Sequence, residues 1–76
     1  PPRHRLWVRL PDKAHPAVRR IELILQMFPG DEQLVLVFED TGRRAAARCC
    51  VHPALVEELR SLAGQGNVAV TEEKTR

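Results

Sequence analysis

Apolar positions at the start of the chain follow first a strand pattern and then a helix pattern. Residues 6–10 place apolar side chains at every second position, which predicts a half-buried strand that Pro11 ends. Pro16 suits the first position of a helix, and apolar residues recur after it at helical spacing. Pro29 and Gly30 end this helix, with Gly30 expected in a left-handed conformation. The predicted stripe contains Val18, Ile21, Ile24, Leu25 and Phe28.

The middle of the chain predicts a hairpin. Residues 34–38 are apolar on both faces, so this strand should be interior or covered on its second face. Residues 39–42 have turn chemistry, because Asp40 can bond its own backbone and Gly42 tolerates a positive φ. Residues 43–49 should return as an antiparallel strand, although the alanines at 45–47 would also fit a helix.

The second half repeats the order of the first. His52-Pro53 repeats the pair His15-Pro16, and each histidine is expected to cap or flank a helix start. Gly64 and Gly66 end the second helix, and residues 68–70 predict a short last strand. The second apolar stripe contains Leu55, Val56, Leu59 and Leu62.

This order of elements predicts an α+β fold. The sequence β-α-β-β-α-β is typical of the ferredoxin-like split βαβ arrangement, with a four-stranded, mostly antiparallel sheet and two helices on one face. That arrangement would place residues 34–38, the most apolar strand, at a sheet edge. Either the strand order differs, or another part of the intact protein covers that edge.

The length of 76 residues allows one domain with a small core. The first residue is Pro1 rather than Met, from which we expect a fragment of a larger protein. Residues 1–5 are expected to be a linker, 6–71 the single α+β domain and 72–76 a frayed tail. The predicted core contains Leu6, Val8, Val18, Ile21, Leu25, Phe28, Leu36, Phe38, Leu55, Leu59 and Leu62.

Composition and charge narrow the function classes. Apolar residues make up 43% and charged residues 29%, which excludes wholesale disorder. No apolar run approaches the roughly 20 residues that a membrane helix needs, and no signal-peptide core is present. The net charge of +2 is too small to indicate a nucleic-acid partner by itself. Ten of the twelve cations are arginines, which suit bidentate contacts.

The two cysteines are adjacent, and Cys49 and Cys50 could form a mutual disulfide only with backbone strain. Free thiols indicate a reducing compartment, and we expect a cytoplasmic location. With His52 the cysteines form a Cys-Cys-x-His order that lacks the spacer of zinc sites. Small buried side chains at a strand end are the alternative to a metal site.

We expect no catalysis, no metal and no cofactor in this chain. It has no phosphate loop, and its one serine, Ser61, lies on a predicted helix without a nucleophile elbow. Glu39 and Asp40 could face a metal ion, but they also fit a solvated turn.

The outward face of the first strand carries the candidate binding residues. Trp7, the only tryptophan, lies there between Arg5 and Arg9. RNA-recognition domains stack bases on aromatic side chains at this position, but the third strand offers only Arg44, Ala46 and Arg48 for a second platform. Trp7 could therefore contact its own linker or a neighbouring domain, a protein partner, or a single-stranded nucleic acid. Protein docking would use Trp7, Arg5, Arg9, Val35 and Val37, by the open face or an edge strand; nucleic-acid binding would use Arg5, Trp7, Arg9, Arg44 and Arg48.

Several stretches resemble the C-terminal segment of bacterial replicative DNA polymerase III alpha subunits. They are Leu6-Trp7-Val8-Arg9-Leu10-Pro11, Met27-Phe28-Pro29-Gly30, residues 36–44 (Leu-Val-Phe-Glu-Asp-Thr-Gly-Arg-Arg), and residues 51–59 (Val-His-Pro-Ala-Leu-Val-Glu-Glu-Leu) with Asn67-Val68.

The resemblance implies a non-catalytic tail that follows an oligonucleotide-binding fold in a DNA-directed DNA polymerase. In that family the polymerase carboxylates and the phosphoesterase-like domain lie far N-terminal, so no active-site residue carries over. It also implies contact with the tau subunit of the clamp loader, or with neighbouring polymerase domains, during DNA replication. DNA would be reached only through the parent chain, and no membrane is involved. The alternatives are a weak single-strand binder and a metal-assisted enzyme that would use Cys49, Cys50 and His52.

Overall fold

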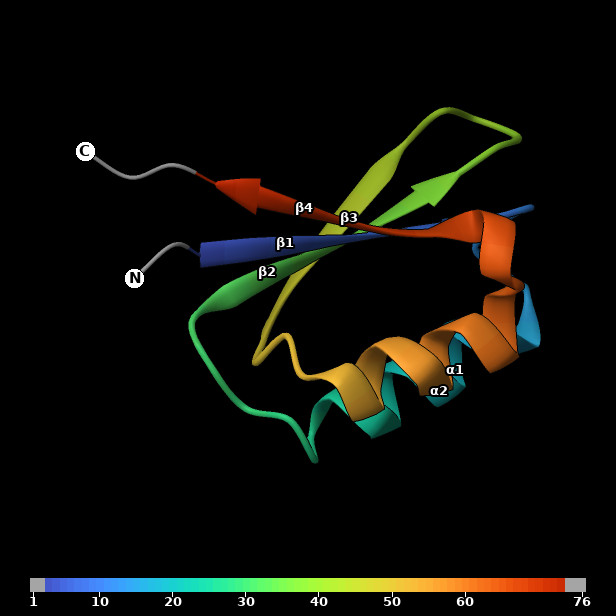
Figure 1. Cartoon of the computed structure of the whole chain (residues 1–76). Coiled ribbons are helices and arrows are strands. Elements are labelled where there is room, and N and C mark those ends of the chain that lie inside the picture. The colour runs from blue at the N-terminus through green and yellow to red at the C-terminus, as the bar shows by residue number, and fades with distance from the viewer. Residues whose placement is uncertain (1–2, 74–76) are drawn as a thin grey trace.

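A computed structural model describes residues 3–73, which form one sheet and two main helices. Both helices lie on the same side of the sheet (Figure 1). This confirms the α+β class and the predicted order of the elements. Along the chain these are β1 (Arg3–Leu10), α1 (Pro16–Leu25), β2 (Glu32–Phe38), β3 (Arg44–Cys49), α2 (Pro53–Ala63), the short 3-10 helix η1 (Gln65–Asn67) and β4 (Val68–Glu73).

The strand order in the sheet is β3-β2-β1-β4. β2 pairs parallel with β1, whereas the β1–β4 and β2–β3 pairs are antiparallel, so the sheet is mixed and mostly antiparallel. α1 thus joins two neighbouring strands, whereas in a split βαβ unit another strand lies between them. The apolar strand β2 is therefore interior, with Leu34 and Leu36 facing the helices and Val35 only 8% exposed on the other face. With this strand order the most apolar strand does not lie at a sheet edge, and no other domain is needed to cover it.

The core lies between the sheet and the two helices. Ile21 of α1 and Leu55 and Leu59 of α2 are fully buried, as predicted. Four residues predicted for the core are only partly buried, because they pack at its margin: Val18, Leu25, Phe28 and Leu62. The core also contains residues that the prediction did not include, namely Leu10, Ala17, Leu34, Cys49, Val56 and Val68.

Each helix begins with a His-Pro pair in which the histidine caps the helix. Nδ1 of His15 accepts a hydrogen bond from the Ala17 N–H at 3.1 Å, and Nδ1 of His52 accepts one from the Ala54 N–H at 3.0 Å. The ring nitrogen takes the place of the side-chain oxygen that usually caps a helix. The proline that follows has no N–H to satisfy. The predicted role of both histidines is confirmed.

The predicted left-handed conformation at Gly30 is wrong. Among residues 3–73, only Gly42 and Gly64 have a positive φ. Gly30 is needed for a different reason: a Cβ there would lie 2.8 Å from the Cys49 carbonyl oxygen and the Cys50 nitrogen. The Cys50 N–H also donates to the Phe28 carbonyl at 2.7 Å. The loop after α1 and the loop after β3 therefore touch through their backbones.

The first and last strands are longer than predicted. Arg3 pairs with Glu73 and Arg5 with Thr71, so residues 3–5 and 72–73 belong to the sheet rather than to a linker and a tail. An ion pair between Arg5 and Glu73 supports this end of the ladder. The remainder of the predicted linker and tail, residues 1–2 and 74–76, lies outside the described residues. Neither helix in residues 3–73 has the length and hydrophobicity to cross a membrane.

Glu32 joins three segments at the open end of the sheet. Its carboxylate accepts the backbone N–H of Val51 at 2.9 Å and that of His4 at 2.6 Å, and lies 3.2 Å from the His4 ring. The Val51 and His4 backbone donors favour the charged form and hold the pKa of Glu32 below its ordinary value of 4.5. The start of β2 is thereby attached to β1 and to the segment before α2.

Truncation of a core side chain should be costly. We expect Ile21→Ala to lower the free energy of unfolding by about 2–5 kcal/mol, because its side chain is fully buried. Leu25→Ala should cost less, because Leu25 lies at the core margin. Urea denaturation of both variants measures the difference. An Ile21→Ala cost below about 0.5 kcal/mol would show that α1 does not pack as described.

The contribution of Glu32 to the free energy of unfolding should depend on pH. A lowered folded-state pKa stabilises the protein above the unfolded-state pKa, and this stabilisation is lost as pH falls through the folded-state pKa. We expect Glu32→Gln to cost about 1–3 kcal/mol at neutral pH. The difference from wild type should shrink as the pH falls below the ordinary pKa of 4.5. Denaturant unfolding across this pH range measures it, with the exposed Glu58→Gln as the matched control. A Glu32→Gln cost that does not change with pH would show that the ionised carboxylate does not stabilise the fold.

Candidate functional site

The face of the sheet opposite the helices, called the outer face here, brings the predicted binding residues together. No helix of residues 3–73 covers this face (Figure 1). β1 is a central strand, and its outward residues lie beside those of β2, whose other neighbour is β3. The outward residues of these three strands are Arg5, Trp7 and Arg9; Gln33, Val35 and Val37; and Arg44, Ala46 and Arg48.

Four arginines surround the middle of this face, and we call them the arginine frame: Arg5 and Arg9 on β1, with Arg44 and Arg48 on β3. Arg9 and Arg44 are the two cross-strand neighbours of Val37, and Arg5 and Arg48 are those of Gln33. Val35 lies at the centre, with Trp7 and Ala46 as its neighbours. The two sides of the frame are separated by two strand spacings, about 9–10 Å, and its ends by four residues, about 13 Å.

Trp7 is held in position by polar contacts. Its Nε1–H donates to Oγ1 of Thr71 at 2.9 Å. The guanidinium carbons of Arg5 and Arg44 lie 5.5 and 5.8 Å from the centre of the Trp7 ring, which is cation–π distance. The partly exposed ring is thus attached to β4, and it lies near one cation of its own strand β1 and one of β3.

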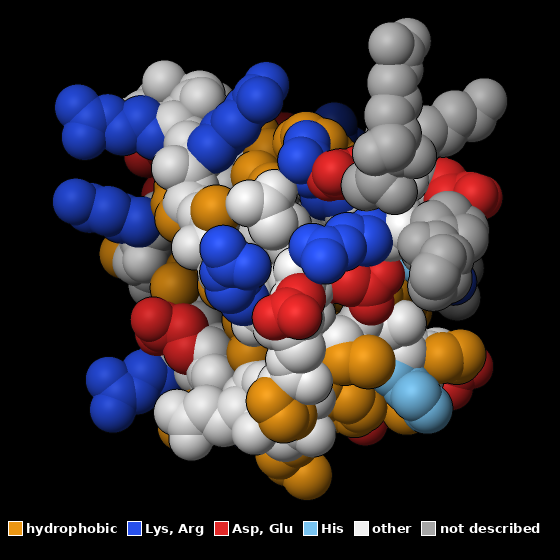
Figure 2. All heavy atoms as spheres, turned by 90° about the vertical axis from the view of Figure 1, so that its left-hand side faces the viewer, with side chains coloured by type: hydrophobic (Ala, Val, Ile, Leu, Met, Phe, Trp, Pro, Cys, Tyr) orange, Lys and Arg blue, Asp and Glu red, His pale blue; other side chains and the backbone are white. Residues whose placement is uncertain are grey.

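The outer face carries an excess of positive charge. Arg5 is paired with Glu73, while Arg9 donates to Oδ1 of Asn67 at 3.1 and 3.0 Å and lies 3.8 Å from Glu39. The other outward arginines have no acidic group within ion-pair distance among residues 3–73: Arg3, Arg44 and Arg48. Figure 2 views the end of the molecule where β1 and β2 begin. Most Lys and Arg side chains there lie in the upper part, on the sheet side, with hydrophobic ones gathered below.

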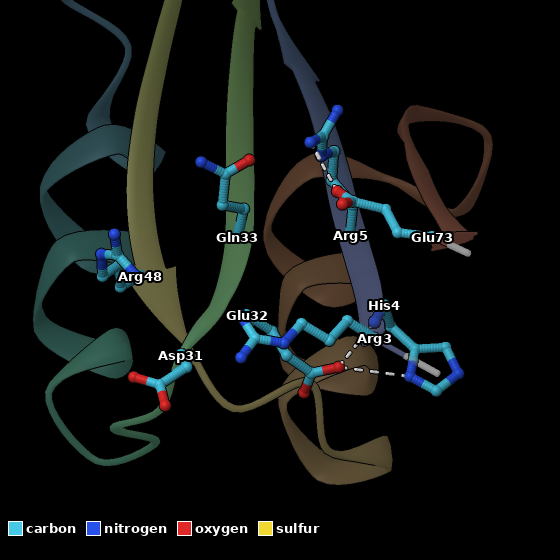
Figure 3. Close-up of a pocket in the computed structure, with 8 residues that line it drawn as sticks. All are labelled: Arg3, His4, Arg5, Asp31, Glu32, Gln33, Arg48 and Glu73. Carbon is cyan, nitrogen blue, oxygen red and sulfur yellow. Dashed lines mark hydrogen bonds and ion pairs between the residues drawn. The ribbon is translucent and has the colours of Figure 1, made fainter. Parts of the chain in front are cut away.

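A shallow polar cavity of about 250 Å³ lies at this end of the sheet. Arg48, Gln33 and Arg5 form a row across β3, β2 and β1 in its wall (Figure 3). Nε of Arg5 is buried without a hydrogen-bond partner, whereas the other end of the same guanidinium reaches Glu73. The acidic side chains that also line the cavity are Asp31, Glu32 and Glu73. A carboxylate or phosphate of a partner would meet both signs of charge here.

The residues considered for a metal site do not come together as ligands. Cys49 is buried, Cys50 is exposed, and Nδ1 of His52 is occupied by the cap of α2. Burial, and to a smaller extent the charge of Glu32, raises the pKa of Cys49 to about 11. Asp40 accepts the Thr41 N–H at 2.7 Å within the turn after β2. Residues 3–73 contain no group of three or more His, Cys, Asp or Glu side chains placed to hold a metal ion.

Several outer-face residues were not predicted from the sequence. Thr71 and Asn67 orient Trp7 and Arg9, and Glu73 neutralises Arg5. Gln33 completes the row between two arginines. Each of these contacts depends on strand order and register. The alternation of apolar and polar residues along one strand does not predict which residues of other strands lie beside it.

The two cysteines should differ in reactivity. We expect Cys50 to react with a thiol reagent in the native protein, and Cys49 to react only on unfolding, because it is buried and its raised pKa leaves little thiolate. Thiol titration with and without denaturant measures this, and Cys50→Ser should remove the native reaction. Equal native rates for both thiols would contradict the burial of Cys49. The absence of zinc remains a prediction for elemental analysis.

Comparisons with known proteins assign no family to the chain. No protein-family model matches it, and neither a curated protein nor a solved structure does.

Proposed function

We propose that this chain is a non-catalytic protein-interaction module of a bacterial replicative DNA polymerase, with the outer face as its docking surface. The observation that carries the proposal is an uncovered sheet face with an apolar centre, Val35 and Trp7, inside the arginine frame. Sheets in globular proteins usually bury their apolar faces against another layer, and here residues 3–73 supply that layer on one side only.

The residue types on this face are those of protein interfaces. Tryptophan and arginine are enriched among interface residues that contribute most to binding, especially near the centre of a contact. Trp7 lies near the centre, and Thr71 fixes its ring before a partner arrives, which lowers the ordering cost of binding.

The resemblance to DNA polymerase III alpha subunits names the partner. We infer contact with the tau subunit of the clamp loader, or with neighbouring domains of the polymerase, in the cytoplasm during DNA replication. DNA would be reached through the parent polymerase. Chemistry would belong to the distant catalytic domains of such a parent chain, and the module would serve as a tether.

A second candidate function is weak binding of single-stranded nucleic acid. Arg44 and Arg48, which have no acidic partner among residues 3–73, favour it, since phosphate contacts dominate such binding. The single aromatic argues against it, because single-strand binders stack successive bases on several rings. A second ring would be needed beside Trp7 or Val35, but Ala69 is the neighbour of Trp7 on β4 and Ala46 is the neighbour of Val35 on β3.

Substitution of Trp7 should separate these candidates. We expect Trp7→Ala to weaken binding of purified tau subunit by about 2 kcal/mol or more, because a central anchor is lost. Isothermal titration calorimetry measures the affinity. Met27→Ala is the matched control, since Met27 is 76% exposed on the helix side and its loss should leave binding unchanged.

The wild-type chain also provides a direct signal for either ligand. Trp7 is the only strong fluorophore, because the chain has no tyrosine. We expect its emission to shift with the protein partner and to stay constant with oligo(dT) at physiological salt. Saturable quenching by oligo(dT) at about micromolar concentration would replace the docking proposal with the nucleic-acid one. If neither tau nor the adjoining polymerase domains bind, the docking function is wrong.

A further inference from the structure

The shape of the outer face limits what can cover it. Val35, Trp7 and Ala46 form an apolar floor, and Val37 extends this floor along β2. The arginine frame places two cations on β1 and two on β3, one pair on each side of the floor. A complementary occupant presents apolar side chains along its middle and negative charge toward β3, because Arg5 and Arg9 on β1 already contact Glu73 and Glu39.

Backbone hydrogen bonding selects the type of segment. β1 and β2 are both flanked by strands, so their N–H and C=O groups are used within the sheet. A segment on the floor finds no backbone partner there and has to satisfy its own polar groups, which a helix does and a lone extended strand does not. The dimensions agree. The frame is about 9–10 Å wide, close to the helix diameter of about 10–12 Å. Its length of about 13 Å corresponds to about nine helical residues.

Charge determines the sign of the occupant. The outward strand positions of residues 3–73 carry five arginines, on β1 and β3, against the single acid Glu73 on β4. A second copy of this chain docked through the same face would oppose two arginine frames and would be repelled. Carboxylates would instead complete the pairing of Arg44 and Arg48, which lack acidic partners among residues 3–73.

We propose that the arginine frame binds an acidic amphipathic helix of a partner protein. The apolar stripe of that helix packs on the partly exposed Trp7 and Val37. Its carboxylates pair with Arg44 and Arg48 on β3, since Arg5 and Arg9 already have partners within this chain. The inference rests on the proposed function, because it specifies the chemistry of the segment that the module docks. The bound helix gives the sheet its second covering layer, with helices on both faces.

An unbiased peptide selection tests the partner chemistry. A display library of random peptides of about 18 residues, long enough to span the frame as a helix, is selected on the immobilised 76-residue chain. Each round is depleted on Trp7→Ala, so that only peptides that need the floor survive. We expect enriched peptides to be net negative, with apolar residues at helical spacing, and to gain helical circular dichroism on binding.

Charge reversal tests the frame itself. The double variant Arg44→Glu with Arg48→Glu should bind the enriched peptides about tenfold or more weakly than the wild type. Replacing the acidic residues of the peptides by lysine should restore part of the lost affinity. Arg19→Glu with Arg20→Glu is the matched control, since these exposed arginines lie on α1, on the far side of the sheet. The control should change affinity by less than about twofold. Thermal melts confirm that each variant is folded.

Three outcomes overturn the inference: enrichment of neutral or basic peptides, equal binding to the charge-reversed variant, or no enrichment that depends on Trp7. Binding of oligo(dT) that is lost on charge reversal would assign the frame to nucleic acid instead. The proposed function fails separately. If tau or a polymerase domain binds through Trp7 but is indifferent to reversal at positions 44 and 48, docking stands and the acidic helix does not.

Discussion

Both faces of β2 carry apolar side chains, and this constraint determines where β2 lies in the sheet. Leu34, Leu36 and Phe38 face the helices, while Val35 and Val37 face outward. A strand of this kind needs neighbours on both sides, because an edge would leave its backbone and part of its apolar surface exposed. With β1 on one side and β3 on the other, Val35 is buried although no helix of residues 3–73 lies above it. The mixed strand order satisfies this requirement.

The outer face follows from the same arrangement. Because β2 supplies the apolar floor, the arginines of its two neighbours are placed on either side of it. β1 and β3 run in opposite directions, so Arg5 lies across β2 from Arg48, and Arg9 lies across β2 from Arg44. A chain with a net charge of only +2 thereby presents a face that is strongly basic at its margins and apolar in its middle. The position of the arginines on the sheet, rather than the net charge, makes this face suited to the proposed docking.

The sequence predicts the elements well and their assembly only in part. Periodicity located both helices and all four strands, and the His-Pro pairs identified the helix starts, because these signals are local. The position of β2 beside β1 could not be predicted, since pairing joins residues far apart in the chain. For the same reason Glu32 was not singled out: its partners, His4 and Val51, are 28 and 19 residues away. Gly30 was assigned the wrong role because its neighbour is a distant backbone segment. The sequence predicts the residues of the candidate surface, whereas the arrangement of the four arginines around Val35 depends on the strand register.

The pairing of Arg3 with Glu73 has a mechanical consequence. The first and last strands run antiparallel and side by side, so the two ends of the described chain lie at the same end of the sheet (Figure 1). Hydrogen bonds between antiparallel strands lie across the strand direction. A force that pulls these two ends apart therefore acts on one bond at a time, like a zipper, rather than on the whole ladder at once. A load applied between the ends would peel β4 from β1 before it disturbed β2, and would release the Thr71 contact to Trp7 early in the process.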